Sequence, residues 1–191
     1  MRNGILGLGL MLAIVPPIAA GASAAEPAAP RPACAAAPAA LGRYQPAKPG
    51  AVLPAAPFVE ADGSERPLDG LRGAPLLVNF WATWCAPCVK EMPALDRLAT
   101  QPPAGLHVLT LSADREGAAV VRQFYETNGI RNLPVALDKT GRVARAAGVS
   151  GLPTTVLYDA EGREAGRVVG TAAWDVPEAV AFLTACLGGE G

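Results

Sequence analysis

Residues 76–81 read LLVNFW, and residues 84–88 read WCAPC. The first run is apolar and predicts a buried strand or a core helix segment. Two cysteines separated by two residues can form a disulfide if a helix begins at the first, because one helical turn brings the second sulfur within bonding distance. Unpaired N–H groups at that helix start also stabilise a thiolate, the nucleophile in disulfide exchange. We therefore predict a redox pair in which Cys85 is the nucleophile and Cys88 resolves the mixed disulfide.

The same spacing occurs in half of a zinc site, which would need two further soft ligands. The single histidine, His107, lies in an apolar run that is typical of a strand, and the other cysteines, Cys34 and Cys186, lie near opposite ends of the chain. A strand before the motif and a helix after it favour redox chemistry. We predict no metal site.

Length and composition indicate one globular domain. The chain has 191 residues, of which 51% are hydrophobic and 17% charged, which is enough apolar material for a core. Its net charge is only −1, and Lys and Arg do not cluster along one face. Nothing in this pattern indicates a nucleic-acid partner.

The N-terminus carries a targeting segment rather than part of the fold. Arg2 precedes an apolar stretch over residues 5–15, and small residues follow as far as Ala24. This arrangement predicts a signal peptide over residues 1–24 with an A-x-A cleavage site. The alternative is an uncleaved membrane anchor, because residues 4–25 carry no charge. Both alternatives place the rest of the chain outside the cytoplasm.

Residues 25–55 are rich in alanine and proline. Such a stretch is not expected to hold a regular helix or a central strand, so we predict a semi-rigid extended linker before a domain over residues 56–191.

The remaining pattern alternates strands and helices. Asp62-Gly63 predicts a hairpin turn, Pro93 a kink in the helix that follows the motif, and Gly129 the end of a later helix. The predicted strands are 58–60, 66–68, 76–81, 105–112, 134–137, 154–158 and 163–169, and the predicted helices are 85–99, 116–128, 141–147 and 173–186. This order predicts an α/β fold with a mixed central sheet covered by helices on both faces.

Three motifs resemble one known family. They are VNFWATWCAPC at residues 78–88, KEMP at residues 90–93 and GLPTT at residues 151–155. Together they resemble the TlpA/ResA-type exported thiol-disulfide oxidoreductases of bacteria, and TlpA most of all. The resemblance extends from about residue 56 to the end. It implies a thioredoxin fold with an N-terminal hairpin, a helical insertion over residues 114–149 and a periplasmic location.

The resemblance also assigns roles to residues outside the cysteine pair. It implies a cis peptide at Pro153 that faces the cysteines and points the backbone of Leu152 toward an incoming peptide, with Thr154 next to it. Trp84, Ala86 and Pro87 would shape the rim and tune the redox pair, although Trp84 could instead pack against the last helix.

Glu91 is one turn beyond Cys88, and the resemblance gives it a role in deprotonating that thiol. A helix glutamate is otherwise most often a solvated surface residue. The buried Asp that thioredoxins keep in the preceding strand is replaced here by Asn79.

Cys34 and Cys186 are expected to pair in an oxidising compartment and so tie the N-terminal tail to the last helix. Intermolecular links and a free buried thiol at Cys186 are the alternatives.

The resemblance implies reduction of disulfides in client proteins of cytochrome c or copper-site assembly. It further implies recharging by a membrane electron donor of the CcdA or DsbD type, with no bound cofactor. The alternatives are a disulfide oxidase or isomerase of the same fold and a non-enzymatic copper-binding module that uses the same two cysteines. A peroxidase is disfavoured, because its partner cysteine would be remote.

Overall fold

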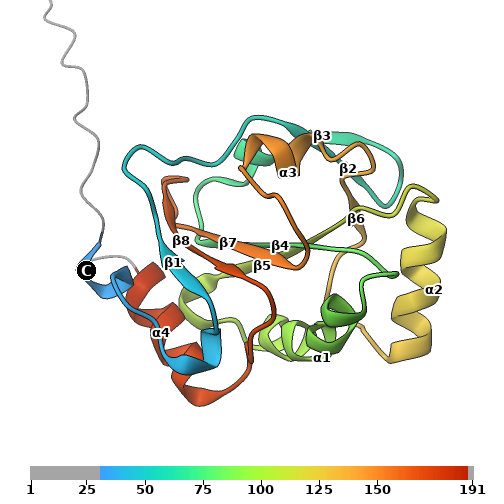
Figure 1. Ribbon diagram of the computed structural model, residues 1–191. Coiled ribbons are helices and arrows are strands. Elements are labelled where there is room, and N and C mark those ends of the chain that lie inside the picture. The colour runs from blue at the N-terminus through green and yellow to red at the C-terminus, as the bar shows by residue number, and fades with distance from the viewer. Residues whose placement is uncertain (1–30, 189–191) are drawn as a thin grey trace, which may run out of the picture.

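An eight-stranded mixed sheet forms the centre of the protein (Figure 1). The computed structural model describes residues 31–188, so the predicted signal peptide or anchor lies outside the described residues. The strands follow the order β1-β8-β7-β4-β5-β6-β2-β3. Their bounds are β1 Tyr44–Pro46, β2 Pro57–Glu60, β3 Glu65–Pro67, β4 Leu76–Trp81, β5 His107–Ser112, β6 Ala136–Leu137, β7 Thr154–Tyr158 and β8 Glu164–Val169.

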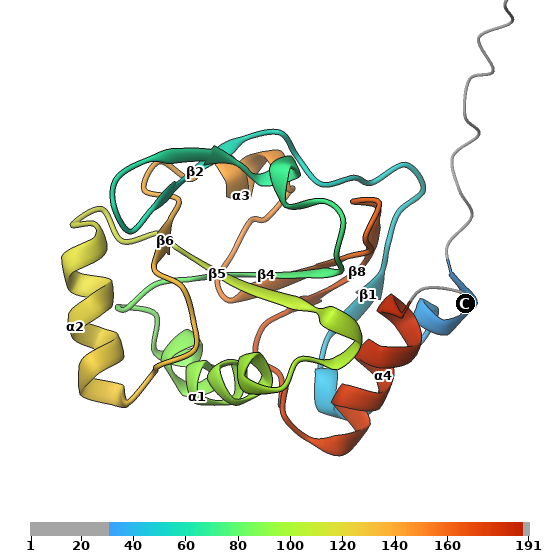
Figure 2. The same cartoon turned by 180° about the vertical axis from the view of Figure 1, so that it is seen from behind.

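Helices cover both faces of this sheet. They are α1 Ala86–Thr100, α2 Ala118–Asn128, α3 Arg142–Ala146 and α4 Pro177–Leu187. In Figure 1, α1 and α4 lie below the sheet and α3 lies above it, and Figure 2 shows the same layers from behind. The predicted α/β class, with a hairpin (β2 and β3) and a helix-containing insertion, is confirmed.

Strand β4 lies in the middle of the sheet and is buried along its whole length. It pairs in parallel with β5 on one side and antiparallel with β7 on the other. Leu77 and Trp81 join the core under α1, α2 and α4, whereas the alternate residues Val78 and Phe80 join the core under α3. Side chains alternate between the faces of a strand, so both faces of β4 are covered by hydrophobic layers.

The last helix begins later than its sequence predicts. It was expected from residue 173, but α4 starts at Pro177. Proline restricts the residue before it to extended conformations, and Val176 has φ −79° and ψ 149°. Proline itself fits the first helical turn, where its missing N–H would have no partner. Residues 173–176 therefore form a loop.

The predicted linker is wrong for the part of it that the structure describes. Residues 31–55 pack against the domain, where they form two short 3-10 helices, η1 (Pro32–Cys34) and η2 (Ala39–Leu41), followed by β1. Leu41 and Leu53 are buried. Proline is tolerated at the first turn of a helix and on an edge strand, and β1 is an edge strand paired only with β8 among the described residues.

A disulfide joins this segment to the last helix. Cys34 in η1 and Cys186 in α4 are bonded across 152 positions of sequence, and both are buried. The hydroxyl of Tyr44 donates a hydrogen bond of 2.7 Å to the carbonyl of Cys34, which holds η1 beside β1. No cysteine in residues 31–188 is free, so the pairing within the chain is the one observed. Within the same residues, no helix is both long enough and apolar enough to cross a bilayer.

Removing the Cys34–Cys186 disulfide should lower stability. We expect Cys34→Ala/Cys186→Ala to reduce the free energy of unfolding by about 2–4 kcal/mol, because a long loop in the unfolded chain is no longer closed. Urea unfolding of the oxidised protein measures this loss. The matched control is Cys85→Ala/Cys88→Ala, which opens a loop with a sequence separation of only 3 and should lose less. Equal losses in the two double variants would contradict the prediction.

Candidate active site

Helix α1 begins at the cysteine motif, as predicted. Cys85 is the N-cap, with extended backbone angles of φ −88° and ψ 95°, and its carbonyl accepts the N–H of Val89 at 3.0 Å. Ala86 and Pro87 are the first two helical residues, positions where proline costs no hydrogen bond. Cys85 and Cys88 form a disulfide. The positive end of the helix dipole therefore lies at Cys85, where it stabilises a thiolate once the bond is reduced.

The two cysteines differ in their access to solvent. Cys85 is 7% exposed and Cys88 is fully buried. The neighbouring Trp84, at 69%, is one of the most exposed large hydrophobic side chains in the described part of the protein. The prediction that Trp84 shapes the rim agrees with this exposure, and the alternative that it packs against the last helix is wrong. Ala86 and Pro87 are also exposed, so a partner protein can reach Cys85 first.

The peptide bond between Leu152 and Pro153 is cis, as predicted. In the sheet, Thr154 lies opposite Phe80 near the end of β4, which places Leu152 and Pro153 beside the segment that leads into the cysteine motif. The hydroxyl of Thr154 donates to the carbonyl of Gly151 at 2.7 Å. Pro153 is buried, and its carbonyl accepts the N–H of Gly170 at 2.9 Å. These bonds hold the turn before β7 in place.

Glu91 is a buried side chain, so its interpretation as a solvated surface residue is wrong. It is only 3% exposed, although it lies on α1 one turn beyond Cys88. Its carboxylate accepts hydrogen bonds from Asn79 Nδ2 at 2.9 Å, Trp174 Nε1 at 3.1 Å and the Ala172 N–H at 3.2 Å. Burial raises the pKa of Glu91 above its ordinary value of 4.5, and the three hydrogen bonds oppose that rise.

Asn79 occupies β4 beneath α1 and connects two strands to the helix. Its Nδ2 donates both to Glu91 and to Thr155 Oγ1 on β7, each at 2.9 Å. Its Oδ1 is buried and has no partner among the described residues. An asparagine can donate to a carboxylate where the aspartate of thioredoxins could not, and this is why Asn79 and Glu91 are compatible neighbours.

Sequence reasoning missed Trp174. It is fully buried in the loop before α4, a loop that sequence analysis assigned to the helix itself, and it donates to Glu91 from 83 positions away. A tryptophan near a helix start gives no local sign of its hydrogen-bond partner. Only the tertiary structure, which brings this loop beside Glu91 of α1, identifies it.

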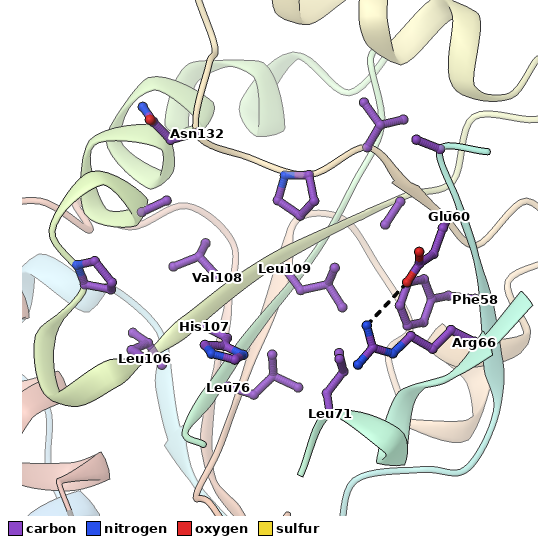
Figure 3. A pocket seen from close by; sticks show the side chains of 16 residues that line it. Phe58, Glu60, Arg66, Leu71, Leu76, Leu106, His107, Val108, Leu109 and Asn132 are labelled. Atoms are coloured by element: carbon purple, nitrogen blue, oxygen red, sulfur yellow. Dashed lines mark hydrogen bonds and ion pairs between the residues drawn. The ribbon is translucent and has the colours of Figure 1, made fainter. Parts of the chain in front are cut away.

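A hollow of about 630 Å³ lies elsewhere on the molecule (Figure 3). Phe58, Leu76 and Leu109 give it an apolar floor, and Arg66 and His107 lie at its side. His107 is opposite Leu76 at the start of β4, and the cysteine motif follows the other end of that strand, about 16 Å away at 3.3 Å per residue. The Cys85–Cys88 pair therefore lies outside this hollow, beside the exposed residues Trp84, Ala86 and Pro87.

Metal-ligating side chains do not gather elsewhere in the described part of the chain. Residues 31–188 bring together no group of three His, Cys, Asp or Glu that could hold a metal ion. His107 is exposed at the first position of β5, where sequence analysis expected a strand residue. The thiols of Cys85 and Cys88, when reduced, are the two soft ligands that this site offers.

The mixed sheet, the flanking helices and a Cys-x-x-Cys pair at the start of α1 define a thioredoxin-like protein. The pattern of the AhpC/TSA family matches residues 49–163, more than half of the chain. The chain belongs to this family.

Named relatives and solved structures agree with that assignment. The chain is 35% identical over 112 residues to thiol-disulfide oxidoreductase ResA of Bacillus thuringiensis strain Al Hakam, a match that covers 58% of this chain and 64% of the relative. It is 33% identical to ResA of Geobacillus thermodenitrificans, over 64% of this chain and 70% of the relative. The crystal structure of a thiol:disulfide interchange protein from Chlorobium tepidum superposes with a TM-score of 0.53 at 27% identity, over 72% of this chain and 95% of that one. The chain thus spans slightly less than two thirds of the Bacillus relative.

The buried carboxylate should make stability depend on pH. Because its folded-state pKa is raised, the contribution of Glu91 is fully present below about pH 4.5 and is lost as the pH rises through the folded-state value. We expect the wild type to lose stability relative to Glu91→Gln as the pH rises, because glutamine cannot ionise. Urea unfolding at a series of pH values from 4 to 8 measures the difference. Glu116→Gln, at an exposed glutamate, is the control and should show no such trend.

Proposed function

We propose that this protein is a thiol-disulfide oxidoreductase that reduces disulfides in client proteins outside the cytoplasm. The observation that carries the proposal is the asymmetry of the Cys85–Cys88 pair at the N-terminus of α1. Cys85 keeps a small exposed fraction of 7% between the exposed residues Trp84 and Ala86, whereas Cys88 is fully buried one helical turn away. The ResA relatives, which are named thiol-disulfide oxidoreductases, support the exchange activity.

The exchange proceeds in two steps. The Cys85 thiolate attacks one sulfur of a client disulfide, the client S–S bond breaks, and a mixed disulfide forms as the first client thiolate leaves. Cys88 then loses its proton and attacks the sulfur of Cys85, which releases the second client thiolate. Two electrons pass to the client, and the protein is left with the Cys85–Cys88 disulfide that the structure contains.

Glu91 is the proposed acceptor of the Cys88 proton. Cys88 is fully buried, so its thiol needs a nearby base, and Glu91 lies one turn further along the same helix. A carboxyl whose pKa is raised by burial is better matched to a thiol than an exposed one. Asn79 and Trp174 orient the carboxylate through their N–H groups.

The proposed client surface surrounds Cys85. Trp84 offers an exposed apolar face, Ala86 and Pro87 leave the sulfur uncrowded, and the backbone of Leu152 before Pro153 offers main-chain groups. An extended client segment could bond to that backbone while its disulfide meets Cys85. The same residues would also tune the redox potential of the pair, because groups beside the first helical turn change the stability of the Cys85 thiolate.

The predicted targeting segment supports a proposal for the cellular setting. We propose that residues 1–24 direct export to the periplasm as a signal peptide or hold the protein there as an anchor. The clients would be proteins of cytochrome c or copper-site assembly, whose cysteines must be reduced before they bind haem or metal. A membrane electron donor of the CcdA or DsbD type would recharge the dithiol.

Single cysteine variants should separate the two sulfurs. We expect Cys85→Ser to abolish reduction of a client disulfide, because the nucleophile is lost. Cys88→Ser should instead accumulate a mixed disulfide, since no resolving thiol remains. Mass spectrometry of the protein after incubation with a disulfide-bonded client detects the covalent adduct. Equal activity in both variants would contradict the mechanism.

The direction of exchange depends on the redox potential of the pair. We expect a value near that of thioredoxin, about −270 mV, in equilibrium with dithiothreitol buffers. A value near about −120 mV would make the protein an oxidase or isomerase. Stoichiometric binding of copper(I) by the reduced protein, without any reduction of a client, would instead support the metal-binding alternative.

A further inference from the structure

Asp114 is a buried carboxylate that the exchange steps do not use. It follows β5, is 1% exposed, and accepts three hydrogen bonds. Two come from Thr83, from the backbone N–H at 2.9 Å and from Oγ1 at 2.7 Å. The third comes from Ser112 Oγ at 2.6 Å. In the sequence pattern, Asp114 is only the first residue of the predicted insertion.

These bonds connect the ends of two parallel strands. Strand β4 ends at Trp81, and its chain reaches Cys85 through Ala82, Thr83 and Trp84. Strand β5 runs beside it and ends at Ser112. The carboxyl ends of parallel neighbours lie at the same edge of a sheet, so Asp114 is placed to bind the short segment that carries the nucleophile.

The three hydrogen bonds fit an aspartate at position 114 better than an asparagine. Two carboxylate oxygens can accept all three donors, whereas asparagine has one acceptor oxygen and would turn its NH₂ toward a donor. No ion pair among residues 31–188 includes Asp114, so hydrogen bonds alone compensate its burial. Burying a carboxylate without a cation costs folding free energy, which indicates that Asp114 has a role beyond packing.

We propose that Asp114 is a positioning residue for the dithiol, which it serves by fixing Thr83 and thereby the approach of Cys85 to Cys88. This inference rests on the proposed function. A fixed segment raises the effective concentration of one thiol at the other, which favours the disulfide over the dithiol. Loosening the segment should therefore move the equilibrium toward the dithiol. Loss of the carboxylate charge bound at Thr83, two residues before Cys85, acts in the same direction, because a negative charge in this region disfavours the thiolate.

The test measures the exchange between the full-length reduced protein and glutathione disulfide. The dithiol gives two electrons and two protons to glutathione disulfide and becomes the Cys85–Cys88 disulfide, with release of two glutathione thiols. Mass spectrometry of alkylated peptides counts the oxidised fraction at each buffer ratio. We expect the equilibrium constant for forming the protein disulfide to fall about tenfold in Asp114→Asn.

Thr83→Val tests the hydrogen bond between Thr83 and Asp114 separately from the charge of the Asp114 carboxylate. It removes one hydrogen bond and leaves Asp114 in place, so we expect a smaller fall in the same direction. Thr83→Ser keeps the hydroxyl and should keep the wild-type equilibrium. A merely structural role would lower the stability of Thr83→Val in urea but leave its glutathione equilibrium unchanged.

Asp159→Asn is the matched control. Asp159 is 4% exposed and accepts the N–H and Nε of Arg163 at 2.8 Å and 2.7 Å. It follows the end of β7, which runs antiparallel to β4, so it lies at the sheet edge opposite Cys85. We expect Asp159→Asn to lose stability in urea without a change in the glutathione equilibrium.

The outcomes separate the two proposals. If the wild type exchanges but Asp114→Asn and Thr83→Val share its equilibrium constant, the positioning role is wrong and the proposed function stands. The same conclusion follows if Asp159→Asn shifts the equilibrium as much as Asp114→Asn does. If the wild-type pair does not exchange with glutathione at all, the proposed function itself fails.

Discussion

The burial of β4 on both faces is the constraint on which the rest of the structure depends. All six of its residues are buried, and it pairs with β5 and β7 along its length. A strand in that position cannot shift its register by one residue without exchanging its two hydrophobic faces. The end of β4 is therefore fixed, and the segment that leaves it delivers Cys85 to the start of α1. The position of the reactive Cys85 therefore depends on a fully buried strand.

A second constraint is polar and lies between β4 and α1. Asn79, Glu91 and Trp174 form a hydrogen-bonded cluster in the core, joined to β7 through Thr155. Burying a carboxylate costs free energy unless donors compensate it, and three donors converge on Glu91. The cluster thus binds helix, sheet and the loop before α4 into one arrangement near the redox pair. Burial in this cluster also raises the pKa of the Glu91 carboxyl.

Sequence patterns predicted the central elements well, because those elements carry strong local signals. Strands β4 and β7 have the bounds that were expected, and α2 ends at Gly129 in the left-handed conformation typical of a C-terminal glycine. The predictions were wrong where local composition or a single proline indicated a different structure. An alanine- and proline-rich stretch was interpreted as a linker, yet its prolines occupy a 3-10 helix start and an edge strand. The start of α4 was placed too early, at residue 173, whereas Pro177 is the first residue of the helix.

The sequence by itself determined the cysteine pair, the strand before it and the helix that begins at Cys85, since each depends on residues that are neighbours in the chain. It also indicated the proline at position 153, through the resemblance that its motif carries. Only the tertiary structure decided which distant groups meet. Trp174 reaches Glu91 across 83 positions, Asp114 reaches Thr83 across 31, and Cys34 bonds to Cys186 across 152. The physical reason is that periodicity and caps report local conformation, whereas long-range partners depend on which strands lie side by side and how the helices pack upon them.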